Sequence, residues 1–297
     1  TNSFYSTYIQ LVILFTVFYI NYIITEIGEF MKINDLFSVE KKVVLITGGS
    51  RGIGEMLASG FLANGAKVYI SSRKSKDCDS TAKRLSEKYK NECISFPADI
   101  SDLQGINKLF NKFAEENSSL DILINNAGAV WGEPFDSFSE DGWDKVMDLN
   151  VKSIFFMIQK FSSLLKKKAS TENPARIINI GSIDGINTPY YENYSYSIAK
   201  SAVHKLTSVL AARLIKENII CNAIAPGPFP SKMLGSAVEH DYSVISKKNP
   251  SRRVGRPEDI AGLALFLSSK AGQYTVGETI TCDGGLVASA GHDLTND

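Results

Sequence analysis

Short apolar runs alternate with longer amphipathic stretches along most of the chain. The short runs, rich in Val, Ile and Leu, are residues 41–47, 67–71, 93–99, 121–127, 175–181, 219–226 and 278–284. The amphipathic stretches are residues 53–63, 76–90, 102–116, about 140–168, 194–217 and 257–269. Runs that are apolar throughout are typical of strands covered on both faces. The alternation predicts right-handed crossovers and an α/β fold with a doubly wound parallel sheet.

This pattern continues without interruption from residue 41 to residue 287. No linker, low-complexity tract or internal repeat divides that range. Of the 297 residues, 44% are hydrophobic, which is enough for a sizeable buried core. We therefore expect a single domain over 41–287, preceded by an apolar extension at 1–40 and followed by a short tail at 288–297.

The extension contains an uncharged, apolar stretch at residues 8–24. Its 17 residues are at the short end of what spans a bilayer. No Lys or Arg precedes it, so it lacks the basic start of a secretory signal. Lys32, Lys41 and Lys42 follow it, so a membrane anchor here would leave the domain in the cytoplasm. The alternatives are a misassigned extension with the true start at Met31, and an apolar arm packed on a partner.

Charge and composition exclude several classes of protein. The 32 basic and 32 acidic residues give a formal net charge of zero, which argues against a nucleic-acid binder. The cysteines are widely spaced, as expected of reduced thiols in a cytoplasmic protein; they are Cys78, Cys93, Cys221 and Cys282. The histidines form no metal-binding pattern, so we expect no metal site; they are His204, His240 and His292.

A glycine-rich turn follows the first predicted strand, with glycines at 48, 52 and 54. Glycines let a backbone approach a pyrophosphate closely, and the next helix points its positive end at that group. The spacing is not that of a P-loop, because Glu55 and Met56 stand where Lys and Ser or Thr are required. The turn favours a dinucleotide site, and a turn without a ligand is the alternative.

The end of the second predicted strand bears on the choice of dinucleotide. An acid there holds the ribose hydroxyl of NAD, whereas an Arg accepts the extra phosphate of NADP. Here Arg73 and Lys74 follow the strand, with no acid before Asp77, and Arg51 lies in the glycine turn. These cations favour NADP(H), although exposed Arg and Lys residues are also common on surfaces without a ligand.

A Tyr-x-x-x-Lys pattern occurs at Tyr196 and Lys200, in a predicted helix. Residues four apart on a helix share one face. A nearby ammonium lowers the pKa of a phenol from its usual value near 10, which would let Tyr196 act as a general acid toward a carbonyl oxygen. Ser182, after a strand, could hydrogen-bond the same oxygen. Taken alone, the pattern is better explained by the surface of an ordinary amphipathic helix.

The motifs occur together and in a fixed order. After the glycine turn come Asn125-Asn126-Ala127-Gly128, Asn150, Ser182, the Tyr-Lys pair and Pro226-Gly227. In this combination the chain resembles the short-chain dehydrogenases/reductases over residues 41–287. The resemblance implies a Rossmann-like fold and hydride transfer between NADP(H) and an alcohol–ketone pair. It also implies a homo-oligomer, a dimer or tetramer, paired through the long helices at 140–168 and 194–217.

The resemblance also implies roles for particular residues. Asn150 would hold a water in a proton relay, and Ser182 would orient the substrate carbonyl. Tyr196 would donate the proton, while Lys200 would bind the nicotinamide ribose and lower the tyrosine pKa. The implied cofactor-binding set is Gly48, Ser50, Arg51, Gly52, Ile53, Gly54, Arg73, Asp99, Asn126, Ala127, Gly128, Tyr196, Lys200, Pro226 and Gly227.

One departure from the family pattern concerns the loop at 183–195. Ser182 and Tyr196 are 14 positions apart, one more than is commonest, so we expect this loop to bulge. The loop also contains Tyr190, Tyr191 and Tyr194, but none of them has a Lys four residues later. Tyr196 is therefore the candidate acid.

The substrate is less clear from the sequence. Residues 228–249 carry apolar side chains that form either a lid over a fatty chain or part of the core; they include Phe229, Met233, Leu234, Val238, Tyr242, Val244 and Ile245. The basic residues that follow could meet the phosphates of an acyl carrier or lie in solvent; they are Lys247, Lys248, Arg252 and Arg253.

Stretches at 173–182 and 225–233 are similar to the 3-oxoacyl reductases named for rhamnolipid biosynthesis. This similarity implies NADPH-dependent reduction of a 3-oxoacyl thioester. Two alternatives remain at this point. One is a reductase or dehydrogenase for a sugar acid, polyol or small ketone, and the other is a membrane-tethered dinucleotide-binding protein that acts by interaction.

Overall fold

Strand β1 (Val43–Thr47) lies inside a seven-stranded parallel sheet of order β3-β2-β1-β4-β5-β6-β7. The computed structural model describes residues 12–20, 32–189, 191–232, 234 and 241–290. The other strands are β2 (Lys67–Ser71), β3 (Cys93–Ser95), β4 (Ile122–Asn125), β5 (Ala175–Ile180), β6 (Ile219–Pro226) and β7 (Thr279–Cys282). Leu45 of β1 is opposite Tyr69 on one side and Leu123 on the other. The expected doubly wound sheet is confirmed.

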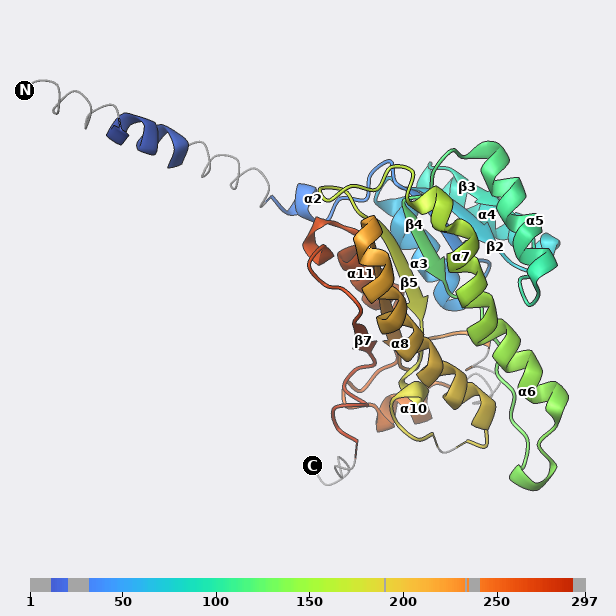
Figure 1. Ribbon diagram of the computed structural model, residues 1–297. Coiled ribbons are helices and arrows are strands. Elements are labelled where there is room, and N and C mark those ends of the chain that lie inside the picture. The colour runs from blue at the N-terminus through green and yellow to red at the C-terminus, as the bar shows by residue number, and fades with distance from the viewer. Residues whose placement is uncertain (1–11, 21–31, 190, 233, 235–240, 291–297) are drawn as a thin grey trace, which may run out of the picture.

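Helices cover both faces of the sheet (Figure 1). One layer consists of α3 (Gly52–Ala63), α4 (Ser75–Tyr89) and α11 (Pro257–Ser268); the other consists of α5 (Leu103–Glu116), α7 (Ser153–Leu165) and α8 (Tyr194–Leu214). Successive strand residues point to opposite faces, so Ile46 packs in the first layer and Leu45 in the second. This two-sided burial explains why the strands are apolar throughout.

The long helix expected at 140–168 is interrupted. Helix α6 (Glu140–Met147) passes through a π-helical turn (Asp148–Lys152) into α7. A π turn widens the helix by one residue and occurs often at functional sites. Asn150 lies at the middle of this turn and is fully buried.

Two other segments differ from the expected boundaries. Strand β3 ends at Ser95 rather than near 99, although the N–H groups of Phe96 and Ala98 still donate to the carbonyl oxygens of Ile70 and Ser72 at 2.8 and 3.1 Å. Helix α8 ends at Leu214 and tightens into a 3-10 turn (Ile215–Glu217). The remaining short helices are α2 (Ile33–Leu36), α10 (Ser243–Lys248) and 3-10 turns at Phe135–Ser137, Ile183–Gly185 and Lys270–Gly272.

The apolar stretch at 8–24 is described only in part. Residues 12–20 are helical, and Leu14, Phe15 and Phe18 are at least 70% exposed. Residues 8–11 and 21–24 lie outside the described residues. Among the residues that the structure describes, no helix has both the length and the apolar character needed to cross a membrane.

Candidate active site

The predicted site residues gather at one edge of the sheet, where the parallel strands have their carboxyl ends. Strand β1 leads into the glycine turn, β4 into Asn126, β5 into Ser182, and β6 ends at Pro226. Helices α6 and α10 lie beyond this edge (Figure 1). In open α/β sheets, ligands bind in the crevice outside the carboxyl ends of the strands.

The glycine turn depends on its glycines for two different reasons. Gly48 and Gly52 have φ angles of +65° and +56°, in the left-handed region that favours glycine. Gly54 instead needs room, because a Cβ there would lie 2.2 Å from the carbonyl oxygen of Gly48. Helix α3 then begins at Gly52 with no side-chain cap from Arg51, so its first amide groups face the turn. Backbone donors at a helix N-terminus suit a phosphate.

Asn126 joins the glycine turn to β4. Its Nδ2 donates to the carbonyl oxygens of Thr47 and Gly48 at 2.9 and 3.1 Å. The Thr47 hydroxyl in turn accepts the backbone N–H groups of Asn126 and Ala127 at 3.0 and 3.1 Å. These bonds hold the ends of β1 and β4 together beside the turn.

The carboxyl end of β2 carries polar groups without a protein partner. The hydroxyl oxygens of Ser71 and Ser72 are buried and have no hydrogen-bond partner among the described residues. A buried, unsatisfied hydroxyl is costly, so these two groups fit a polar ligand at this strand end. Arg73 is exposed, and its guanidinium lies 3.9 Å from the carboxylate of Asp99. The cation and the acid predicted to contact the cofactor are therefore neighbours.

Ser182, Tyr196 and Lys200 are brought together by β5 and α8. Ser182 follows β5, and its hydroxyl oxygen accepts the backbone N–H of Asp184 at 3.2 Å. Lys200 is buried, and its ammonium donates to the carbonyl oxygen of Ile180 at 2.7 Å while lying 5.5 Å from the centroid of the Tyr196 ring. A hydroxyl, a phenol and an ammonium thus lie together at the end of β5.

The expected lowering of the Tyr196 pKa is wrong for this arrangement. Burial, opposed by the hydrogen bond to Ser182 and assisted by the carboxylate of Asp184, raises the pKa of Tyr196 to about 12. The ammonium of Lys200 is directed at a backbone carbonyl rather than at the phenol, and burial lowers the pKa of Lys200 to about 8. Tyr196 therefore carries its proton at neutral pH, which is the form that a proton donor must have.

Asn150, in the π turn, bonds the loop that follows β4. Its Oδ1 accepts the N–H of Ala129 at 2.8 Å, and its Nδ2 donates to the Ala129 carbonyl at 2.9 Å. Gly128 lies close to both Asn150 and Lys200: a Cβ on Gly128 would stand 3.2 Å from Oδ1 of Asn150 and 3.7 Å from Nζ of Lys200. The side chain thus fixes the loop after β4, and its water-binding role stays a prediction.

Sequence reasoning missed Asp184 and His204. Asp184 is half-buried, burial raises its pKa, and Asn193 donates to its carboxylate at 3.4 Å. His204 lies one turn after Lys200 and accepts the N–H of Ser182 at 3.4 Å through Nε2. The i+4 spacing from Lys200 is the signal that could have identified His204. Within the described part of the chain, no group of three or more His, Cys, Asp or Glu could hold a metal.

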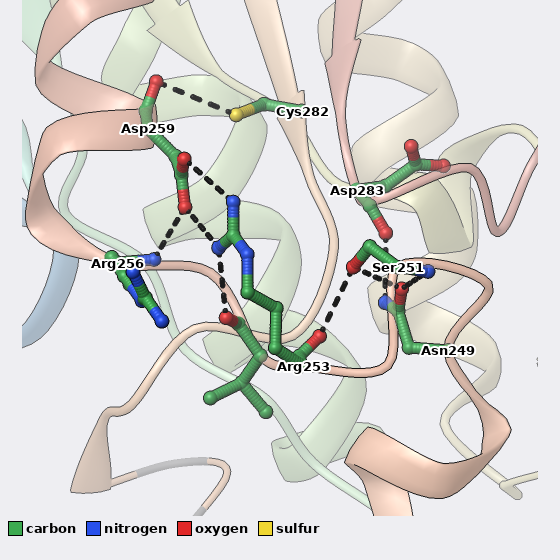
Figure 2. A network of polar contacts seen from close by, with 8 residues as sticks. Asn249, Ser251, Arg253, Arg256, Asp259, Cys282 and Asp283 are labelled. Carbon is green, nitrogen blue, oxygen red and sulfur yellow. Dashed lines mark hydrogen bonds and ion pairs between the residues drawn. The ribbon is translucent and has the colours of Figure 1, made fainter.

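The segment after β6 is tied back to the core by polar contacts (Figure 2). Arg253 makes two bonds to the carboxylate of Asp259, at 2.5 and 2.9 Å, which occupy its guanidinium. Asn249 donates to the carbonyl oxygen of Asp283 at 2.9 Å, and so links this segment to the end of β7. Arg253 is therefore a structural contact rather than an open phosphate ligand.

The apolar residues of this segment do not form one group. Phe229 is buried in the core, where a Cβ on Gly255 would lie 2.3 Å from its ring, so of the two alternatives the core applies to this residue. Val244 of α10 is 53% exposed. Lys247, Lys248 and Arg252 are exposed. Met233 and Val238 lie outside the described residues. Gly227 donates to the Cys282 carbonyl at 3.0 Å, which holds Pro226-Gly227 beside β7.

Comparison with known proteins gives consistent matches over the whole domain. A family model described as enoyl-(acyl carrier protein) reductase matches residues 48–287. The rhamnolipids biosynthesis 3-oxoacyl-[acyl-carrier-protein] reductase of Pseudomonas aeruginosa is 45% identical over 84% of this chain and 98% of its own length. The 2-dehydro-3-deoxy-D-gluconate 5-dehydrogenase of Dickeya dadantii is 35% identical over 85% and 98%.

Solved structures agree with this assignment. The structure of an RhlG/NADP active-site complex from Pseudomonas aeruginosa matches with a TM-score of 0.81 at 45% identity, covering 85% of this chain and 98% of that one. L-sorbose reductase from Gluconobacter frateurii, complexed with NADPH and L-sorbose, matches with a TM-score of 0.77 at 26% identity, covering 84% and 98%. The chain belongs to the short-chain dehydrogenase/reductase family of oxidoreductases.

Proposed function

We propose that this enzyme uses NADPH to reduce the ketone of a 3-oxoacyl thioester to the 3-hydroxyacyl product. The observation that carries the reaction type is the meeting of Ser182, Tyr196 and Lys200 at the sheet edge that also bears the glycine turn. A proton donor and a dinucleotide cradle at one crevice are what carbonyl reduction needs.

The cofactor assignment depends on groups at two strand ends. The turn at 48–54 would receive the pyrophosphate, and Ser71 and Ser72 offer buried hydroxyls for the adenosine ribose. Arg51 lies in the glycine turn and Arg73 follows β2, so both are placed in the sequence where a cation for the ribose phosphate is expected. Arginine suits this task because its planar guanidinium binds phosphate through two parallel hydrogen bonds. The similar Pseudomonas aeruginosa structure is a complex with NADP, which supports the same choice.

The proposed proton transfer uses this chain's own residues. Bound NADPH would supply a hydride to the carbonyl carbon. Ser182 accepts the Asp184 N–H, so the hydrogen of its hydroxyl remains available to the substrate carbonyl oxygen. Tyr196 donates its phenolic proton to that oxygen, which completes the alcohol and leaves a phenolate. The ammonium of Lys200, within reach of the ring, stabilises that negative charge.

The substrate class is supported by charge as well as by similarity. The loop at 183–195 contains Asp184 and Glu192 but no Lys or Arg, so it offers no cation for the carboxylate of a sugar acid. The ketone of a 3-oxoacyl thioester has no charge near the reacting carbon. The second candidate, a sugar-acid dehydrogenase, rests on the similarity to the Dickeya dadantii enzyme.

The test follows the oxidation of NADPH by the purified chain with acetoacetyl-CoA, a longer 3-oxoacyl-CoA and 5-keto-D-gluconate. We expect turnover of the thioesters with NADPH and little with NADH. Turnover of the sugar acid alone would contradict the substrate proposal and leave the reaction type standing. A folded chain that binds NADPH but reduces no ketone would contradict the reaction itself.

The proposed working form is a homo-oligomer. Helices α7 and α8 carry apolar side chains that are exposed in the single chain: Phe155, Ile198 and Val209 are 37%, 49% and 53% exposed. Burying such side chains against a second copy would be favourable. Light scattering should give a dimer or tetramer, and a monomer would contradict this part of the proposal.

A further inference from the structure

His204 fills the space behind the turn that follows Ser182. A Cβ on Gly181 would lie 2.1 Å from its Nε2, and a Cβ on Gly185 would lie 2.8 Å from its Cε1. Glycine at both positions therefore lets the imidazole pack directly against the backbone of the Ile183–Gly185 turn. The ring reaches this position from α8, one helical turn beyond Lys200.

The two ring nitrogens bond to opposite ends of this turn. Nε2 accepts the backbone N–H of Ser182 at 3.4 Å, and the ring also hydrogen-bonds the backbone of Gly185. The first bond needs a nitrogen without a proton, so the proton belongs on Nδ1, which donates to the Gly185 carbonyl. One neutral imidazole thus bonds a donor before the turn and an acceptor after it, and it shares that acceptor with the Ser201 hydroxyl at 2.7 Å.

The surroundings keep this imidazole neutral. Burial lowers the pKa of His204 to about 4, and the nearby Lys200 ammonium lowers it as well. Protonation would place a hydrogen on Nε2 and remove the acceptor that Ser182 uses. Over the pH range of an enzyme assay, the contact between the ring and the turn is therefore maintained.

We propose that His204 is a positioning residue that holds the backbone of Ser182, and through it the Ser182 hydroxyl, in place beside Tyr196. The hydroxyl has little freedom to correct an error in its backbone, because its oxygen is already engaged by the Asp184 N–H. An error of about 1 Å in the placement of a catalytic group can cost about a hundredfold in rate. This inference rests on the proposed function because its kinetic test uses the proposed substrate.

The kinetic test compares two substitutions of similar size. His204→Gln keeps one acceptor and one donor at the end of the side chain, whereas His204→Leu has neither. We expect kcat to fall by about tenfold in the Leu variant and by less than about threefold in the Gln variant, with KM for NADPH unchanged in both. If the Leu variant does not fold, His204→Asn replaces it, because its shorter amide does not reach both ends of the turn.

A coupling measurement separates positioning from general damage to α8. In a Ser182→Ala background, His204→Leu should change kcat by less than about twofold, because the hydroxyl that it positions is gone. Thr207→Val is the matched control. It removes a buried hydroxyl from the same helix, one that bonds Val203 and Asn179, and should leave kcat unchanged. The proposal would be overturned if His204→Leu lowered kcat about tenfold in the Ser182→Ala background as well. It would also be overturned if Thr207→Val lowered kcat as much as His204→Leu does.

A readout that needs no substrate keeps this inference independent of the proposed function. Hydrogen exchange of a peptide covering 178–189 should be faster in His204→Leu than in the wild type, and unchanged in His204→Gln. Equal exchange in all three proteins would overturn the positioning role. Failure of the wild type to reduce any thioester would contradict only the proposed function.

Discussion

Gly54 lies so close to Gly48 that a Cβ on Gly54 would stand 2.2 Å from the Gly48 carbonyl oxygen. Gly54→Ala should therefore displace the turn between β1 and α3. We expect the Kd for NADPH to rise by more than about tenfold and the melting temperature to fall, since overpacking costs about 1–3 kcal/mol. Isothermal titration and thermal denaturation measure both effects.

The control for that substitution is another helical glycine. Gly262 lies in α11, and a Cβ there would meet nothing within 4 Å. Gly262→Ala should leave NADPH binding unchanged and raise stability by about 0.5–1 kcal/mol, because alanine is the better helix former. Equal loss of binding in both variants would show that the contact between Gly48 and Gly54 is not the cause.

Tyr196→Phe removes the proposed proton donor and keeps the ring. We expect kcat to fall by about two to four orders of magnitude, the usual contribution of a general acid, with NADPH binding retained. Tyr194→Phe is the matched control. Its partly exposed hydroxyl donates to Glu192 at 3.1 Å, and kcat should stay within about twofold of the wild type. Similar activity in the two variants would rule out Tyr196 as the acid.

The rate of reduction should depend on the ionisation of Lys200. Burial lowers the pKa of Lys200 to about 8, so the ammonium that would stabilise the phenolate is lost as pH rises through that value. Tyr196, with a pKa of about 12, remains protonated throughout the same range. We therefore expect kcat for reduction to be highest below pH 8 and to fall above it. A flat profile from pH 6 to 10 would contradict this role.

Arg73 should determine the preference for NADPH. Arg73→Ala removes a cation near Asp99, and we expect KM for NADPH to rise by about tenfold with little change for NADH, since a charged hydrogen bond contributes about 1.5–3 kcal/mol. Lys83→Ala, which removes an exposed cation from α4, should change neither KM. An equal effect on both cofactors would place the phosphate contact elsewhere.

Asp184 should disfavour anionic ketones. Asp184→Asn removes a carboxylate that acts on both Tyr196 and Lys200. We expect kcat/KM for 5-keto-D-gluconate to rise by about tenfold relative to that for acetoacetyl-CoA, because like charges repel in a partly buried site. An unchanged ratio between the two substrates would mean that this charge does not select the substrate.

The architecture and most site positions could be predicted because their signals are local. The strand β5 and the turn after β1 are continuous stretches whose composition reflects burial and backbone conformation. Tyr196 and Lys200 share a helix face, which spacing alone reveals. These features need no knowledge of what packs against them.

The features that were missed depend on contacts between distant segments. The π turn at Asp148–Lys152 adds one residue within an otherwise continuous helical stretch, and periodicity over a long window does not reveal so local a change. Lys200 was expected to lower the pKa of Tyr196, but its ammonium donates to the carbonyl oxygen of Ile180. His204 acquires its role only because β5 brings Ser182 against α8. Each depends on tertiary packing rather than on local pattern.

The strand order also has a consequence for synthesis. Strands β3, β2, β1 and β4 are neighbours, and all of them have been translated by Asn125, well before Ser182 and Tyr196 leave the ribosome. The nucleotide half can therefore assemble while the proton-transfer half is still unmade. In a chain released at that stage, β4 (Ile122–Asn125) would be an unpaired edge strand, although all four of its residues are buried in the complete fold. Such an exposed edge can pair with another chain. Premature termination between the halves is thus expected to yield aggregates rather than a soluble nucleotide-binding fragment.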